Sequence, residues 1–298
     1  MQLAELHLHL DGSLRQKTVH DLAARHGLMV PAELTFRPGM GLDAALSKFA
    51  FMLSLLQSPE EVRRVASEIC EDAAHDGVTR LEIRFAPQLH RAAPLEAIVD
   101  AALEGAAGRA GLILCGLYGE PPPLLESLVQ VASTRSGVVG IDLAGGPLST
   151  HAHRLSDYAP AFARARELGL GRTVHAAEGR PPGEIRVAVE RLFAQRIGHG
   201  TTLLDDPAVV DLVLERGVAI EACPTSNVHT GVLSDVSEHP LPRWLVLGVR
   251  ACISADNTLL SAVTTSEEHA RARSIPGMTP ELVQQAVANA HAAAFRRG

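Results

Sequence analysis

The chain has 298 residues, which is enough for one large domain or two small ones. Hydrophobic residues make up 46% of the sequence, so the chain can build a large core and is not expected to be disordered. The formal net charge of −7 gives no reason to expect nucleic acid or an anionic membrane as a partner.

Targeting signals are not evident in the sequence. The first residues lack the charged segment and the apolar segment of a secretory leader. No apolar run approaches the roughly 18 residues that cross a membrane. We therefore expect a soluble cytoplasmic protein.

The four cysteines are scattered without the spacing of a disulfide framework or a cysteine-rich zinc site. These residues are Cys70, Cys115, Cys223 and Cys252. We expect each of them to be a small buried side chain.

Eight short strand-like runs alternate with longer helical runs along the chain, which is the pattern of a parallel α/β fold. The predicted strands are Ala4–His9, Arg80–Phe85, Gly111–Leu117, Val138–Ala144, Arg172–His175, Arg196–His199, Val218–Cys223 and Val249–Ser254. Eight strands of this kind predict a (β/α)8 TIM barrel. We expect it to occupy residues 1–298 as a single domain.

The segment 14–77 is too long to hold one barrel helix. Three helices are predicted in it, near Gln16–His26, Leu42–Gln57 and Pro59–His75. A helical excursion after the first strand lies over the mouth of a barrel where active sites are found, so we expect these helices to form a lid. Four apolar side chains of the second helix could line that lid or pack between helices: Phe49, Phe51, Met52 and Leu55.

The first candidate site residues are His7 and His9. Residues two apart on a strand point to the same face, so both imidazoles are expected at the mouth of the barrel. A His-x-His pair alone also fits polar residues where a strand meets its loop. The pair therefore needs support from other strands.

Three further strands end in residues of the same chemical type. His175 ends the fifth predicted strand and is followed by Glu178, His199 lies between two glycines at the end of the sixth, and Asp256 follows the eighth. Metal ligands and acid–base groups would thus meet at one end of the barrel. An open zinc site needs this combination of protein ligands and a free position for water.

The scarcity of lysine narrows the chemistry. The sequence contains two lysines, Lys17 and Lys48, and neither lies on a predicted strand. Barrel hydrolases with two metals often bridge their ions with a modified lysine, so a single metal ion is favoured here. The same observation argues against Schiff-base chemistry.

Together these elements resemble the adenosine deaminase family of the amidohydrolase superfamily. The resemblance rests on seven stretches in family order: His7-Leu8-His9-Leu10-Asp11-Gly12, Glu82-Ile83-Arg84-Phe85-Ala86-Pro87, Gly140-Ile141-Asp142-Leu143-Ala144-Gly145, His175-Ala176-Ala177-Glu178, Arg196-Ile197-Gly198-His199-Gly200, Glu221-Ala222-Cys223-Pro224-Thr225-Ser226-Asn227 and Ser254-Ala255-Asp256-Asn257. They extend over nearly the whole chain. The combination is specific, although no single stretch is.

The resemblance implies a metal site and a reaction. The implied ligands of one Zn²⁺ are His7, His9, His175 and Asp256. A metal of this kind lowers the pKa of a bound water to about 7. By the same resemblance, the catalytic residues are Glu178, which protonates N1 of the purine, His199, which orients the water and handles its proton, and Asp256.

The resemblance also implies contacts to a small purine nucleoside. Gly145 is similar to the family glycine whose backbone N–H meets N3, and His9 lies beside the substrate. Asp11 matches the residue that accepts the ribose 5′-hydroxyl, and its charge would repel a 5′-phosphate. Asp142 is expected to be structural, and Ser226 and Asn227 are expected to support the site loop.

Two positions depart from the family pattern. Asn257 stands where the family commonly has a second aspartate that bonds N7, although an asparagine amide can donate to an unprotonated N7. Tyr118, expected near the pocket wall, stands where many members have an arginine–histidine pair. Both departures concern the purine pocket.

The leading hypothesis is deamination of adenosine and 2′-deoxyadenosine. The alternatives are deamination of adenine, deamination of a 5′-modified nucleoside such as aminodeoxyfutalosine, and a metal-binding barrel without catalysis. The cytidine-deaminase type of fold is disfavoured because the Pro-Cys-x-x-Cys zinc motif is missing from the sequence. The oligomeric state and the replacement of zinc by another divalent metal are left open.

Overall fold

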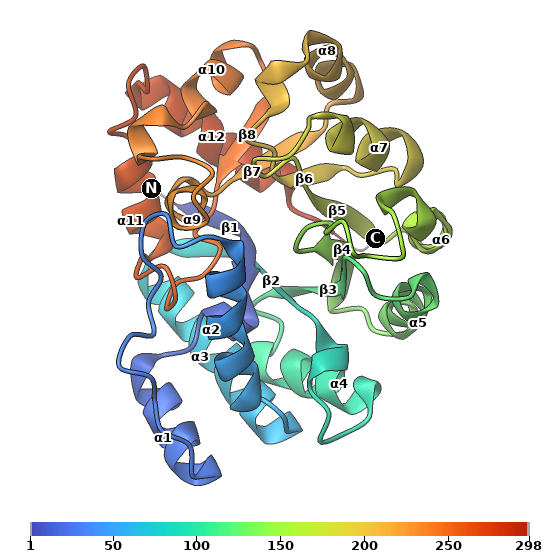
Figure 1. Cartoon of the computed structure of the whole chain (residues 1–298), viewed down its shortest axis with the longest axis vertical. Helices are drawn as coiled ribbons and strands as arrows, with labels where there is room; N and C mark the ends of the chain where they lie inside the picture. Colours follow the sequence, from blue (N-terminus) through green and yellow to red (C-terminus); the bar gives the residue numbers. More distant parts are fainter. Residues whose placement is uncertain (1, 297–298) are drawn as a thin grey trace.

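A ring of eight parallel strands with helices around its outside forms the centre of the molecule (Figure 1). This computed structural model describes residues 2–296. The strands are β1 (Leu3–His9), β2 (Val78–Phe85), β3 (Gly111–Leu117), β4 (Val138–Ala144), β5 (Gly171–Ala176), β6 (Arg196–His199), β7 (Ala219–Ala222) and β8 (Arg250–Ile253). Every predicted strand is present, with ends within two residues of those expected. The predicted (β/α)8 TIM barrel is confirmed.

Neighbouring strands pair in sequence order from β1 to β8. The ring is nearly closed by a parallel bridge between Leu8 and Asp256. Around this bridge the His9 N–H donates to the Asp256 carbonyl at 2.8 Å, and the Asp256 N–H donates to the His7 carbonyl at 2.9 Å. The backbone hydrogen bonds that close the ring therefore link three predicted site residues, His7, His9 and Asp256.

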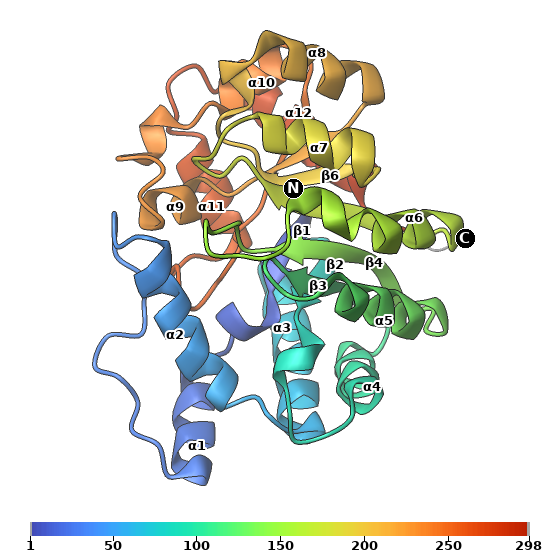
Figure 2. The same cartoon turned by 45° about the vertical axis from the view of Figure 1, so that its right-hand side comes forward.

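The helices surround the ring and also project on one side of it (Figure 2). They are α1 (Gln16–His26), α2 (Leu42–Ser54), α3 (Pro59–His75), α4 (Leu95–Ala106), α5 (Pro122–Ser133), α6 (Ala159–Glu167), α7 (Gly183–Arg191), α8 (Pro207–Arg216), α9 (Pro224–His229), α10 (Leu241–Val246), α11 (Thr265–Ala272) and α12 (Pro280–Ala293). Five 3-10 turns are η1 (Leu10–Gly12), η2 (Pro87–Leu89), η3 (Leu155–Tyr158), η4 (Leu203–Asp205) and η5 (Val236–Glu238). Of the helices within residues 2–296, none is long and apolar enough to cross a membrane.

The segment after β1 holds the three predicted helices, and α2 ends three residues earlier than expected. The cause is the start of α3, where Ser58 takes an extended backbone and forms a capping box with Glu61. The chain must therefore leave the helical conformation before Ser58. Gln57 helps to end α2 because its amide donates to the Leu53 carbonyl at 2.7 Å.

The four apolar residues predicted for the lid have different surroundings. Phe49 lines the cavity at the barrel mouth, whereas Met52 and Leu55 are fully buried in the hydrophobic core. Phe51 packs against that core and is partly buried. The action of these helices as a lid stays a prediction, as does the assignment of the whole range 1–298, whose residues 1, 297 and 298 lie outside the described part, to one domain. All four cysteines are buried and free, as predicted.

Candidate active site

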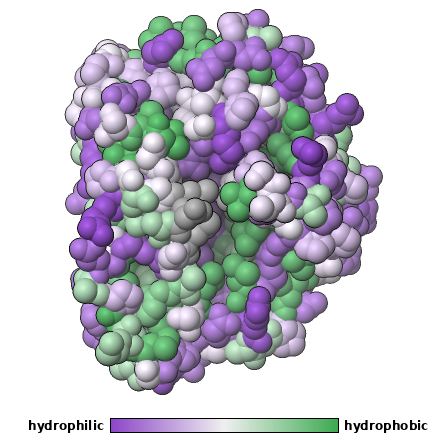
Figure 3. All heavy atoms as spheres, viewed as in Figure 1, coloured by the Kyte–Doolittle hydropathy of each residue, from purple (hydrophilic) through white to green (hydrophobic). Residues whose placement is uncertain are grey.

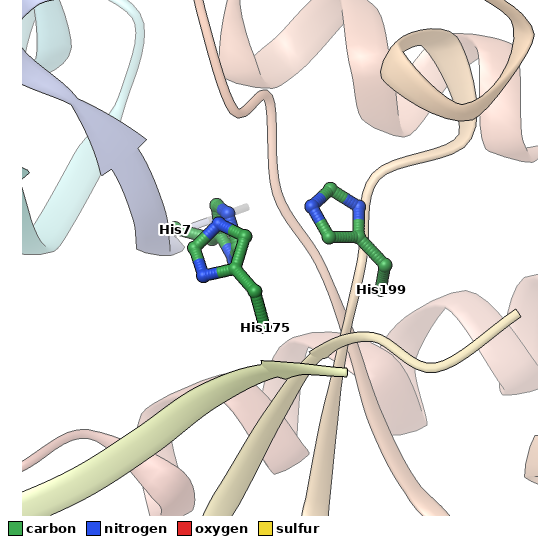
Figure 4. Close-up of side chains that lie close together, drawn as sticks. All are labelled: His7, His175 and His199. Atoms are coloured by element: carbon green, nitrogen blue, oxygen red, sulfur yellow. The ribbon is translucent and has the colours of Figure 1, made fainter. Parts of the chain in front are cut away.

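Three histidines and one aspartate converge at the carboxyl ends of the strands. His7 and His9 lie at the end of β1, His175 lies in β5 and Asp256 follows β8. Asp256 Oδ1 is 3.6 Å from His7 Nε2 and 3.4 Å from His9 Nε2. The Nε2 atoms of His9 and His175 are 3.3 Å apart. Figure 4 shows the rings of His7 and His175 close together, with His199 facing them.

Buried carboxylates fix the orientation of two of these rings. His7 Nδ1 donates to Glu221 Oε2 at 2.6 Å, and His175 Nδ1 donates to Asp142 Oδ2 at 3.0 Å. Each ring therefore presents Nε2, with its lone pair, to the centre of the group. His7 Nε2 is buried and has no hydrogen-bond partner among the described residues. A buried lone pair of this kind fits a metal ion.

Burial also keeps the imidazoles neutral, which metal binding requires. Burial and the nearby Arg84 hold the pKa of His7 well below its ordinary value. Burial and the neighbouring His175 lower the pKa of His9 in the same way. Nitrogen and oxygen donors in this number suit zinc.

Other groups of three possible ligands lie close by and include His199 and Cys223. Burial raises the pKa of the Cys223 thiol well above its ordinary value, so this residue is a poor ligand. His199 Nδ1 lies 3.1 Å from Asn227 Nδ2, and the same amide nitrogen lies 3.4 Å from Glu178 Oε1. Because Nδ2 faces the Glu178 carboxylate, it donates to His199 Nδ1, which places the His199 proton on Nε2. A protonated nitrogen cannot bind a metal but can donate to a water.

Glu178 lies in the loop after β5 and faces the cavity. Its Oε1 accepts a hydrogen bond from Thr230 Oγ1 at 3.0 Å and lies 3.9 Å from His199 Nδ1. Burial alone would raise the pKa of Glu178, but the nearby His199 and His175 lower it by more. The pKa of Glu178 therefore lies below its ordinary value. The carboxylate is therefore ionised in the absence of a substrate.

A cavity of about 230 Å³ opens beside these residues, and its wall is mainly apolar. Figure 3 shows a hollow in this face of the molecule, with hydrophobic side chains gathered beside it. The predicted substrate contacts line the cavity: His9, Asp11, Gly145 and Asn257. Among the described lining residues there is no lysine or arginine. Burial and the nearby Asp256 raise the pKa of Asp11 to about 6.

Two glycines lie close to the proposed substrate contacts. A Cβ atom on Gly12 would lie 1.8 Å from Asn257 Oδ1, so the glycine is needed for the asparagine to take its place. Gly145 has a φ of 79°, in the left-handed region that favours glycine. Gly145 lines the cavity, so its backbone lies close to the space for a ligand.

The Tyr118 side chain lies near the cavity wall, as expected, although it does not line the cavity. Its hydroxyl donates to the His175 carbonyl at 2.8 Å, and Leu117 lines the cavity in its place. The structure confirms a buried structural position for Asp142, which pairs with Arg84 at 2.9 Å. Ser226 lines the cavity and Asn227 contacts Glu178 and His199.

Sequence reasoning assigned no role to Glu221, Arg84, Arg196 or Thr230. Glu221 accepts from Arg84 Nη2 at 2.8 Å and lies 2.6 Å from Arg196 Nε, so two guanidinium groups hold the carboxylate that orients His7. The sequence did carry a signal for the charged residues among these, because charged side chains inside the strands of a barrel need partners of opposite charge. Their pairing depends on strand order around the ring, which no local pattern gives.

Comparisons with known proteins agree with this geometry. A family model described as adenosine deaminase matches residues 3–297. The adenosine deaminase of Serratia proteamaculans is 33% identical over 316 residues, covering 99% of this chain and 94% of the relative.

Solved structures give the same result. The adenine deaminase of Arthrobacter aurescens has a TM-score of 0.89 at 26% identity, covering 99% of this chain and 94% of that one. A Zn-bound amidohydrolase from Burkholderia ambifaria has a TM-score of 0.89 at 24% identity, covering 100% and 86%. The N6-methyl-AMP deaminase of Arabidopsis thaliana has a TM-score of 0.86 at 24% identity, covering 100% and 93%.

Proposed function

Because the chain belongs to the adenosine deaminase family, we propose that it converts adenosine and 2′-deoxyadenosine to inosine and 2′-deoxyinosine, with release of ammonia. The chain is a hydrolytic deaminase of the amidohydrolase type, and its substrate is a small purine compound. The observation that carries the finer proposal is the meeting of four metal-ligand side chains, Glu178 and His199 beside one apolar cavity.

The proposed metal site holds one Zn²⁺ through His7, His9, His175 and Asp256. The unpartnered Nε2 of buried His7 supports this assignment, and so does the Zn bound to the related amidohydrolase of Burkholderia ambifaria. When bound, the metal supplies Lewis acidity that activates a water molecule at neutral pH. The lack of lysine on the barrel strands supports a single ion.

The chain's own residues move the protons of the reaction. The Nε2–H group of His199 donates a hydrogen bond to the attacking water and so orients it, while the Asp256 carboxylate takes up the proton that this water loses. Glu178 takes up a proton from solvent when the substrate binds and delivers it to N1 of the purine, which makes C6 accept the water oxygen. The proton held by Asp256 then passes to the amino group, which leaves as ammonia when the C6–N bond breaks. The C6 hydroxyl returns its proton to Glu178, and the 6-oxo purine remains. Proton transfer of this kind typically contributes about 10²–10⁴-fold to the rate.

The proposed substrate contacts favour a nucleoside. Asp11 accepts the 5′-hydroxyl, the Gly145 N–H meets N3, and the Asn257 amide donates to N7. Since no cationic side chain is found among the described residues that line the cavity, a 5′-phosphate would meet only Asp11, whose carboxylate repels it. This distinguishes the proposed substrate from that of the structurally similar N6-methyl-AMP deaminase.

Adenine is the second candidate substrate, because the adenine deaminase of Arthrobacter aurescens is 26% identical and similar in fold. A small cavity of about 230 Å³ also suits a free base. The buried carboxylate of Asp11 favours the nucleoside because it offers a partner for a ribose hydroxyl. We also propose that the protein lies in the cytoplasm, because thiols stay reduced there and the four cysteines of this chain are free and buried.

A substrate panel tests the proposal. Purified protein is analysed for metal and then incubated with adenosine, 2′-deoxyadenosine, adenine, AMP and 5′-deoxyadenosine, with ultraviolet detection of the 6-oxo product. We expect about one zinc per chain and kcat/KM values highest for adenosine and 2′-deoxyadenosine. A higher kcat/KM for adenine or 5′-deoxyadenosine would make that compound the assigned substrate. Bound metal without turnover of any compound would support the alternative of a metal-binding barrel without catalysis.

A further inference from the structure

A second cavity, of about 630 Å³, lies at the end of the barrel opposite to the active site. It opens at the amino ends of β5 to β8, whereas the site residues follow the carboxyl ends of the same strands. Six arginines line it: Arg166, Arg172, Arg196, Arg216, Arg250 and Arg296. Among its described lining residues there is no aspartate or glutamate. We call this cavity the arginine basin.

Several of these guanidinium groups are held in place by the backbone and by an aromatic ring. Arg172 donates to the carbonyls of Phe193 at 2.9 Å and Leu170 at 2.6 Å. Arg166 lies over the Phe193 ring, 4.7 Å from its centre. Arg250 packs against the end of α8, where a Cβ on Gly217 would lie 3.4 Å from its Nη1. These contacts orient the guanidinium groups of Arg172 and Arg166 beside the cavity.

Ion pairing does not neutralise most of the basin. Arg196 forms its floor and is paired with two buried carboxylates, Glu82 and Glu221. Within the part of the chain that the structure describes, no carboxylate pairs with Arg166, Arg172, Arg216 or Arg250. Arginines on other parts of the surface do have such partners, such as Arg135 with Asp100 at 2.6 Å.

Helix dipoles explain only part of this arrangement. Arg166 and Arg216 lie in the last turns of α6 and α8, where the negative end of a helix favours a cation. Arg172 and Arg250 start or nearly start strands, where no such dipole exists. Burial and the positive charge of Arg166 lower the pKa of Arg172. Like charges gathered in a protein of net charge −7 cost folding free energy, which a bound anion would offset.

We propose that the arginine basin binds a small anion with a chain of two or more phosphates, such as a nucleoside triphosphate or inorganic tripolyphosphate. Guanidinium groups match phosphate oxygens through paired N–H donors. Four unpaired cations balance the charge of a di- or triphosphate better than that of one phosphate. The cavity of about 630 Å³ has the size of a small-molecule site and is concave, which favours a small ligand over a macromolecule.

Isothermal titration of the metal-loaded full chain tests this proposal. The probes are inorganic tripolyphosphate, ATP, AMP and orthophosphate, with Mg²⁺ in excess and the zinc content measured before and after. The basin variant is the double substitution Arg166→Gln, Arg250→Gln. Its matched control, Arg243→Gln, removes the charge of an exposed arginine on α10 that has no ion-pair partner in the described part of the chain. Neither variant changes an active-site residue.

We expect tripolyphosphate to bind and the double variant to weaken its affinity about tenfold or more, as loss of charged hydrogen bonds does. Arg243→Gln should leave the affinity within about twofold. Equal affinities of ATP and tripolyphosphate would identify the phosphate chain as the recognised group, and tighter binding of ATP would identify a nucleotide. The proposal fails if neither binds at about 1 mM, if orthophosphate binds as tightly, or if both variants weaken binding equally.

Discussion

Glu221 on β7 accepts a hydrogen bond of 2.6 Å from Nδ1 of His7 on β1, past the intervening strand β8. This bond turns His7 Nε2 toward the other proposed ligands. We predict that Glu221→Gln lowers zinc affinity by about 10–100-fold, the usual effect of losing a carboxylate behind a metal-binding imidazole. Competition with a chromogenic chelator measures the change.

The control for this prediction is Glu82→Gln. Glu82 pairs with Arg196 at 2.6 Å in the same buried network, but it does not contact a proposed ligand. Both variants should lose stability, because each leaves a buried guanidinium without one partner. Only Glu221→Gln should lose zinc affinity. Equal losses in the two variants would show that the network acts through stability alone.

Gly198 on β6 leaves the space that the His7 ring occupies. A Cβ at this position would lie 2.9 Å from His7 Cε1 and 3.4 Å from His175 Cα. We predict that Gly198→Ala displaces the His7 ring and lowers zinc content and activity together. Gly183→Ala is the control, because nothing lies within 4 Å of its added Cβ. Zinc content measured by atomic absorption should fall in the first variant and not in the second.

The sequence predicted the eight strands well because each is an apolar run between turn signals, and their order follows from the alternation with helices. His7, His9, His175, His199 and Asp256 were found for the same reason: they lie directly at strand ends. Parallel strands bring such ends together whatever the rest of the chain does. Local pattern and global fold therefore agree at these positions.

The supporting contacts could not be predicted in this way. The contact of Glu221 with His7 spans 214 positions in the sequence and depends on the angle between two strands of the ring. The bond from Thr230 to Glu178 depends on where α9 comes to lie. The bond from the Tyr118 hydroxyl to the His175 carbonyl likewise depends on how β3 and β5 lie in the ring. These are tertiary relationships without a local signal.

Asp11 should decide between a nucleoside and a free base. It lines the cavity and is buried, so its carboxylate can accept a ribose hydroxyl without competition from bulk water. We predict that Asp11→Ala raises KM for adenosine by about tenfold, the worth of one charged hydrogen bond. Turnover of adenine and 5′-deoxyadenosine should change little, because neither carries the 5′-hydroxyl. Equal effects on all three substrates would argue for a structural role of Asp11.

Glu268 should make stability depend on pH. Burial raises its pKa to about 7, against hydrogen bonds from Thr225 that lower it. The folded protein therefore keeps this proton up to a higher pH than the unfolded chain does. Stability is unaffected below the ordinary pKa of 4.5, falls as pH rises toward about 7, and stays reduced above it.

Replacement of the carboxyl by an amide removes this cost. We predict that Glu268→Gln gains stability relative to the unsubstituted protein as pH rises from 5 to 8, by at most about 3 kcal/mol. Urea unfolding of both proteins at several pH values measures the difference. A difference that stays constant over this range would mean that Glu268 ionises normally in the folded state.

Glu178 should separate metal binding from proton transfer. Its carboxylate faces the cavity and is held by Thr230 Oγ1 at 3.0 Å. Glu178→Gln keeps the shape and the hydrogen-bond acceptor but cannot deliver a proton to N1. We predict unchanged zinc content and a loss of about 10²–10⁴-fold in kcat. Thr230→Val removes the contact and keeps the carboxylate, so it should cost much less. If Glu178→Gln retained the full rate, Glu178 would not be the proton donor, and a different group would have to protonate the purine.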